Sequence, residues 1–183
     1  MENFLCDRFA DALVTQVVCQ AGQDGKIGRT ALQKILYFLQ AKGVPVGYKF
    51  DIQHYGPYSQ DLYFRMDDLV ADEFVMDVSE QRHRSEYQKG PKAEDLLKEN
   101  EASLLTYQRD VSDVLTLFKG IPSEKMGLLA TVHYIQSSHA SFYNIPPDEE
   151  LVICKVAKIK KRFSSDEIQE AYEILERAGV FNW

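Results

Sequence analysis

Two short segments constrain the fold of this chain more than any other feature. The first covers residues 30–40 and reads TALQKILYFLQ, and the second covers residues 54–63 and reads HYGPYSQDLY. The first predicts a helix with a strongly apolar face, and the second predicts a turn at Gly56-Pro57 that leads into another helix. Together they predict a unit made of a helix, an extended segment and a second helix.

Local signals mark both ends of the first of these helices. Thr30 and Gln33 match a capping box, in which the hydroxyl and the amide each satisfy an otherwise unpaired backbone donor. Gly43 is expected to end the helix. Its buried face is predicted to consist of apolar residues three or four positions apart, which are Leu32, Ile35, Leu36 and Leu39.

Further elements complete the N-terminal half. Residues 3–20 carry an apolar stripe at helical spacing, and residues 59–73 predict the helix that follows the Gly-Pro turn. Residues 46–54 are expected to be extended. In residues 74–79, Phe74, Met76 and Val78 alternate with Val75, Asp77 and Ser79. Residues 86–88 follow after a polar tip, so a β-hairpin wing is predicted here.

The C-terminal half reads as helical throughout. Residues 104–118 suit one long amphipathic helix, and Ser123 is expected to cap the next, which is apolar on most sides. Acidic residues after Pro146-Pro147 predict the start of another helix, extending to residue 162. Ser164 and Glu167 form a second capping box ahead of the final helix.

These elements predict a mainly α protein with a small β-hairpin. We expect a winged-helix-like module at residues 1–91, packed on a helical extension at residues 92–183. A folded chain of 183 residues buries roughly 70% of its unfolded surface, so no metal or disulfide is needed for stability.

Composition narrows the class of protein. The net charge is −7 and the pI is near 5.1, which argues against a nucleic-acid binder that uses its whole surface. The chain has an odd number of cysteines, begins without a secretory leader pattern and has no apolar run long enough to span a membrane. We therefore expect a cytoplasmic protein that is not bound to a membrane.

The two opening segments resemble those of a known family. LQKILYF at residues 32–38 and HYGPYSQDLY at residues 54–63 are similar to motifs of the Panacea domain family, the SocA-like antitoxins of bacterial and prophage toxin–antitoxin loci. The resemblance extends over about residues 5–90. It implies a module that binds a protein partner, such as a toxin, and neutralises it or delivers it to a protease.

The sequence offers no recognisable catalytic or metal-binding pattern. His133 and His139 are six residues apart and point to different sides of a helix, so His133 is expected to be a hydrogen-bonded core residue. The cysteines lack ligand spacing and are expected to be buried thiols. The glycines at positions 22, 25 and 28 lack the pattern of a phosphate-binding loop and predict a flexible turn. We expect no enzyme activity, no catalytic residue, no metal and no cofactor.

Candidate partner-binding residues fall into two groups. Tyr55 and Tyr58 flank the Gly-Pro turn and are either core residues or binding anchors. Residues 155–162 carry five positive charges in eight positions, which leaves −12 for the rest of the chain. In a helix, part of this run would form a basic face, which is either merely solvated or a site for an acidic partner. The candidates here are Lys155, Lys158, Lys161 and Arg162.

The alternative function is a DNA-binding transcriptional regulator of the winged-helix type. Arg82, Arg84 and Lys89 at the wing would then contact phosphates. Residues 58–80, however, contain seven acids and a single cation, Arg65, so the helix in the recognition position would repel DNA. The sequence therefore favours protein binding, with weak or no binding to nucleic acid. The identity of the partner and the oligomeric state stay open.

Overall fold

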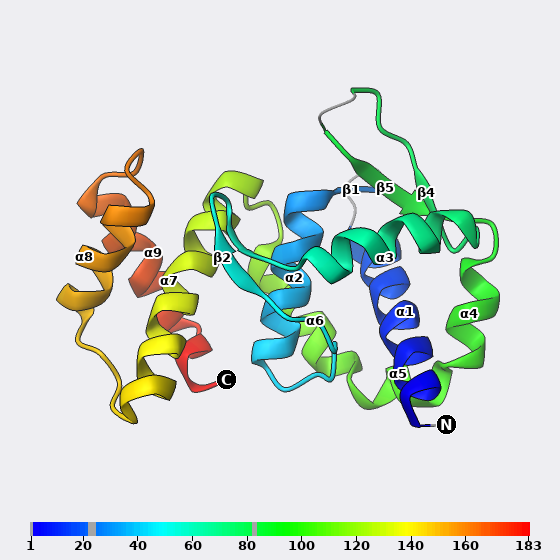
Figure 1. Cartoon of the computed structure of the whole chain (residues 1–183), viewed down its shortest axis with the longest axis horizontal. Coiled ribbons are helices and arrows are strands. Elements are labelled where there is room, and N and C mark those ends of the chain that lie inside the picture. Colours follow the sequence, from blue (N-terminus) through cyan, green and yellow to red (C-terminus); the bar gives the residue numbers. More distant parts are fainter. Residues whose placement is uncertain (1, 22–24, 82–83) are drawn as a thin grey trace.

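The computed structural model describes residues 2–21, 25–81 and 84–183, with side chains from Arg8 onward. The first half begins with α1 (Glu2–Ala21), β1 (Lys26–Gly28), α2 (Arg29–Ala41), β2 (Asp51–Gln53) and β3 (Gly56–Tyr58). It continues with α3 (Gln60–Ala71), β4 (Val75–Asp77) and β5 (Glu86–Lys89). The prediction of a mainly α protein with a small β-hairpin is confirmed (Figure 1).

The second half is built from helices. In chain order they are α4 (Ala93–Glu99), α5 (Glu101–Thr106), α6 (Gln108–Phe118), α7 (Ser123–Tyr143), α8 (Glu149–Ile159) and α9 (Ser165–Arg177), followed by the 3-10 turn η1 (Val180–Asn182). The prediction of one long helix over residues 104–118 is wrong, because the chain bends at Tyr107 between α5 and α6. Ser123 is the first residue of α7 and makes no cap, since Pro122 occupies the N-cap position.

The predicted wing is present and contains an additional strand. β4 and β5 form the antiparallel hairpin, and β1 pairs with β5 in the order β1-β5-β4, with Ile27 opposite Tyr87. The prediction of a flexible turn at the glycines is therefore wrong at Gly28, which lies in β1. Gly25 lies in a turn, whereas position 22 lies outside the described residues.

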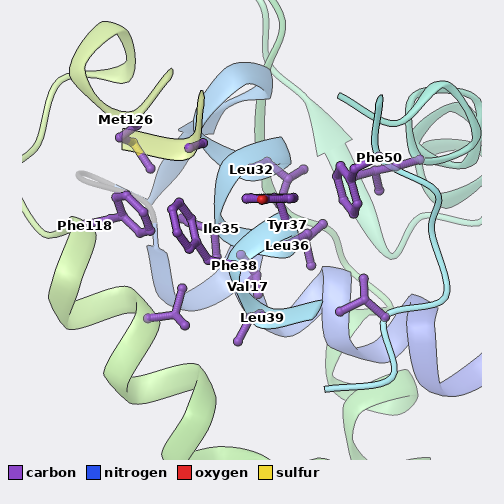
Figure 2. Close-up of a cluster of buried hydrophobic side chains, with 14 of the residues drawn as sticks. Val17, Leu32, Ile35, Leu36, Tyr37, Phe38, Leu39, Phe50, Phe118 and Met126 are labelled. Carbon is purple, nitrogen blue, oxygen red and sulfur yellow. The ribbon is translucent and has the colours of Figure 1, made fainter. Parts of the chain in front are cut away.

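The core is centred on α2. Leu36, Phe38 and Leu39 are fully buried, and the ring of Phe38 lies 4.8 Å from that of Phe118 on α6 (Figure 2). Buried residues of α1, α7 and α9, such as Leu13, Leu129 and Leu175, belong to the same hydrophobic cluster. Burial of several large side chains at about 1.5–3 kcal/mol each makes this cluster the main source of stability.

The elements are spread along one long axis. Figure 1 shows α8 and α9 at one end of the molecule and α1 with α4 at the other, with α2 between them. α7 contacts α2 on one side and α8 and α9 on the other. This arrangement places the loop between β2 and β3 beside α7, and Tyr55 in this loop lies near Arg162 at the end of the basic run.

Candidate functional site: the turn between β2 and β3

The segment HYGPYS is fixed to α2 by two polar side chains. Gln33 Nε2 donates to the Ser59 carbonyl at 2.9 Å, and Ser59 N donates to Gln33 Oε1 at 2.9 Å. Lys34 Nζ donates to the Pro57 carbonyl at 2.5 Å. The predicted capping box of Thr30 with Gln33 is therefore wrong: α2 starts at Arg29 with Gly28 in the N-cap position, and the Gln33 amide binds a segment 26 residues away.

The position of the turn also differs from the prediction. Gln53 pairs with Gly56 and Ile52 with Pro57, so the turn is at His54-Tyr55 and Gly56-Pro57 begins β3. Gly56 has φ +92°, a conformation that side chains rarely adopt, and a Cβ there would lie 2.8 Å from the Gly127 carbonyl of α7. A Cβ on Gly127 would in turn lie 2.8 Å from the Tyr55 carbonyl. These two glycines allow the turn to pack directly on α7.

Two buried lysines hold the turn from opposite sides. Lys160 Nζ donates to the His54 carbonyl at 2.7 Å, and Lys34 binds the Pro57 carbonyl as described above. Their residues are 3% and 1% exposed, and neither forms an ion pair with a described acidic residue. Burial lowers the pKa of Lys34 to about 7, with a further contribution from the charge of Lys160. Burial likewise lowers the pKa of Lys160 to about 8, helped by Arg162.

Tyr55 projects from this fixed turn into solvent. Its residue is 56% exposed, and its ring lies 4.8 Å from that of His54 in a perpendicular arrangement. The Arg162 guanidinium lies 5.9 Å from the Tyr55 ring and 5.1 Å from the Phe163 ring. Arg162 also pairs with Glu124 at 3.1 Å. We call this patch, made of Tyr55, Lys161, Arg162 and Phe163, the Tyr55–Arg162 surface.

The basic run is arranged differently from the prediction. α8 ends at Ile159, so Arg162 lies beyond the helix and not on a face shared with Lys155 and Lys158. Lys158 and Lys161 are exposed, and Lys155 is partly buried. The structure therefore brings Tyr55 together with the end of the basic run, and Lys155 lies in α8 and not in that end.

Tyr58 belongs to a different aromatic group. Its ring lies 6.5 Å from that of Tyr63, over which the Arg29 guanidinium lies at 5.2 Å. Partial burial raises the pKa of Tyr58, and Arg29 opposes the shift. Tyr58 is thus half-buried, unlike Tyr55.

The sequence analysis did not single out Phe64 on α3. Its residue is 59% exposed, and it interrupts the acidic residues of that helix.

The residues predicted to contact DNA have acidic neighbours. Arg84 pairs with Glu86 at 3.3 Å, and Lys89 pairs with Glu94, whereas Arg82 lies outside the described residues. On α3, Arg65 donates to both carboxylate oxygens of Asp11, at 2.7 and 2.6 Å, and to Asp68 at 2.9 Å. Arg65 therefore binds two carboxylates, and its bidentate contact with Asp11 joins α3 to α1.

His133 is confirmed as a hydrogen-bonded core residue. Its Nδ1 lies 2.7 Å from the Tyr37 hydroxyl, and burial lowers the pKa of His133 to about 4. The expectation of buried thiols is wrong for Cys154, which is exposed, while Cys19 is partly buried with a raised pKa. Over the part of the chain that the structure describes, no group of three or more acidic, histidine or cysteine side chains could hold a metal ion.

Comparison with known proteins finds a distant relative. The chain is 25% identical over 151 residues to the "Uncharacterized protein YwgA" of Bacillus subtilis (strain 168), covering 82% of this chain and 86% of that protein. No protein-family model matches. Within the described residues, no helix is both long enough and apolar enough to cross a membrane.

Proposed function

We propose that this chain is an antitoxin-like protein-binding module that neutralises or delivers a protein partner, such as a toxin, through the Tyr55–Arg162 surface. The observation that carries the proposal is the meeting of Tyr55 with Arg162, which are 107 positions apart in the sequence. Tyrosine and arginine, together with tryptophan, are enriched among the residues that dominate binding energy at protein interfaces.

The support beneath this surface favours binding without large rearrangement. Gln33, Lys34 and Lys160 fix the backbone of the turn, so Tyr55 loses little backbone freedom when a partner binds. The adjacent Lys158 and Lys161 add positive charge, which favours a partner with an acidic rim around an apolar or aromatic pocket.

The alternative function, a DNA-binding transcriptional regulator, has less support. It would depend on Arg82, Arg84 and Lys89, and the last two already have carboxylate partners. The exposed face of α3 carries Asp61, Asp67 and Asp68, which would face phosphate in a major-groove complex. Cytoplasmic action is part of our proposal, because an exposed free thiol such as Cys154 persists in a reducing compartment.

Site-specific photo-crosslinking tests the proposal. A photoreactive phenylalanine analogue replaces Tyr55 in the full chain, which is expressed in its native cell, irradiated and analysed by mass spectrometry. The matched control places the analogue at Phe142, an 80% exposed aromatic residue on α7. We expect a discrete crosslinked protein from position 55, absent from position 142 and lost on Arg162→Glu.

Growth then distinguishes an antitoxin from another kind of binding protein. The captured partner is expressed alone and together with the chain. Growth arrest by the partner alone, with rescue by the wild-type chain but not by Arg162→Glu, supports neutralisation. A partner that has no effect on growth would refute the antitoxin role, and equal crosslinking from positions 55 and 142 would refute the surface.

A further inference from the structure

A second surface lies at the other end of the molecule from the Tyr55–Arg162 surface. An open groove of about 500 Å³ runs between α1 and the helices α4 to α6. It is lined in part by Leu97, Leu104 and Leu105, with Gln16 from α1 and the acids Asp95 and Glu101. Figure 1 shows α4 and α5 at the end opposite α8 and α9, so a ligand in this groove would not touch Tyr55.

The leucines give the groove an apolar surface in contact with water. Leu105 is 58% exposed, Leu97 is partly buried and Leu104 is 6% exposed. Full burial of one exposed leucine typically gives a substantial gain in free energy, so leaving Leu105 in solvent is unfavourable for a chain that acts alone. A partner side chain that covers Leu105 would remove this exposure.

One buried acceptor in the groove lacks a donor. Gln16 Oε1 has almost no accessible surface and no hydrogen-bond partner among the described residues. A buried polar atom without a partner is unfavourable, and such atoms are usually satisfied by protein or ordered water. Rotation of the Gln16 side chain towards the groove would let a donor group, such as a lysine or arginine side chain, satisfy this oxygen.

The charge of the lining indicates the sign of the occupant. Glu94, Asp95 and Glu101 line the groove together with one lysine, Lys98. Glu94 already pairs with Lys89, whereas Asp95 and Glu101 form no ion pair within the described part of the chain. The carboxylates outnumber the one lysine of the lining, which favours a cationic ligand and disfavours an acidic one.

We propose that this groove binds a basic amphipathic helix of a protein partner, with an aliphatic side chain against Leu105 and cations at Asp95 and Glu101. A helix that lays its apolar face in a groove is a common mode of peptide recognition. The inference does not depend on the function proposed above, since the two surfaces have opposite charge and share no residue.

A designed peptide of leucine and lysine at helical spacing is the probe. Its length of about 15 residues is the range in which an isolated helix becomes marginally stable. The control peptide keeps the leucines and replaces every lysine by glutamate. Binding to the full chain is measured by fluorescence anisotropy, and the side-chain amide signals of Gln16, Gln20 and Gln108, all in the groove lining, locate the peptide by NMR.

Variants test the assignment at the level of residues. We expect the double substitution Asp95→Lys with Glu101→Lys to weaken binding about tenfold or more. Leu105→Ser should weaken binding similarly, and unlike the charge changes it does not lie in the first turn of a helix. The matched charge control is Glu150→Lys with Glu176→Lys, two exposed acids on α8 and α9. This control should bind like the wild type.

Several results would overturn the inference. Equal binding of the lysine and glutamate peptides would exclude electrostatic selection. Peptide-induced NMR changes on α3 instead of the groove would assign binding to the acidic face around Phe64. A concentration-dependent dimer abolished by Leu105→Ser would make a second copy of the chain the occupant.

Discussion

The buried lysine beneath the turn makes stability depend on pH in a direction that the structure determines. Lys34 is 1% exposed, and its pKa is about 7 in the folded chain, against 10.5 for an ordinary lysine. Between these two values the unfolded chain carries the proton and the folded chain does not. Stability therefore rises with pH across this window, by up to about 1.4 kcal/mol for each pH unit.

Replacing Lys34 by methionine should remove this dependence. The variant keeps much of the side-chain volume but leaves the Pro57 carbonyl without its donor, a loss of about 1–3 kcal/mol at high pH. At low pH the loss is offset, because the wild type must then bury a charged ammonium group. The difference in unfolding free energy between wild type and variant should change by about 3 kcal/mol between pH 6.5 and pH 9.5.

Urea unfolding at several pH values measures this difference directly. Lys161→Met is the matched control, because Lys161 is exposed and its replacement should give a curve parallel to that of the wild type. The charge of Lys160 contributes to the low pKa of Lys34. Lys160→Met should therefore raise the pKa of Lys34 in the folded chain and move the lower edge of the pH window upwards. Parallel curves for wild type and Lys34→Met would refute the reasoning, since Lys34 would then titrate alike in both states.

Three further predictions concern the turn, a helix start and DNA. Gly56→Ala should lower the unfolding free energy by more than about 3 kcal/mol, because it combines a positive φ with overlap on α7. Gly43→Ala, at φ +95° in open space, should lower it by only about 1–2 kcal/mol, and equal losses in urea unfolding would contradict the close approach at Gly56. Ser164→Ala should cost about 1 kcal/mol through loss of the capping box, while Ser165→Ala, one position inside the helix, should be nearly neutral in thermal unfolding. Duplex DNA, including the promoter of its own gene, should bind no tighter than about 10⁻⁶ M near physiological salt; a footprint at nanomolar protein that is lost on Arg84→Ala would favour the regulator.

Some features that depend only on neighbouring residues were predicted correctly. Ser164 and Glu167 form the expected capping box. Ser59 also caps α3, by accepting from Leu62 N at 3.3 Å, although this cap was not predicted. Both contacts span three residues, so the pattern of side chains contains the whole interaction. The same applies to the apolar face of α2, where Leu36 is fully buried as predicted.

Contacts between distant residues could not be read in this way. Gln33 was assigned to its own helix because Thr30 suited a local cap, but Ser59 offered the Gln33 amide both a donor and an acceptor. β1 pairs with β5 some 60 residues later, and a three-residue strand gives almost no periodicity to detect. Lys160 reaches His54 across 106 positions, which no pattern within the basic run could indicate.

Two signals in the sequence were available and not used. A Ser164 cap requires extended backbone, so the preceding helix had to end before that residue, close to Arg162. Lys34 stands inside the run LQKILYFL, where nearly every neighbour is apolar, which indicates a buried cation with a polar partner.

Affinity for the crosslinked partner tests the central claim most directly. Titration calorimetry with the purified partner would compare the wild type, Tyr55→Ala, Arg162→Glu and, as control, Phe142→Ala. We predict that each of the first two substitutions weakens binding by about 2 kcal/mol, roughly 30-fold, with an unchanged melting temperature, since exposed residues contribute little to stability. Affinities within about threefold of the wild type for both variants, well inside one factor of ten, would show that the partner binds elsewhere.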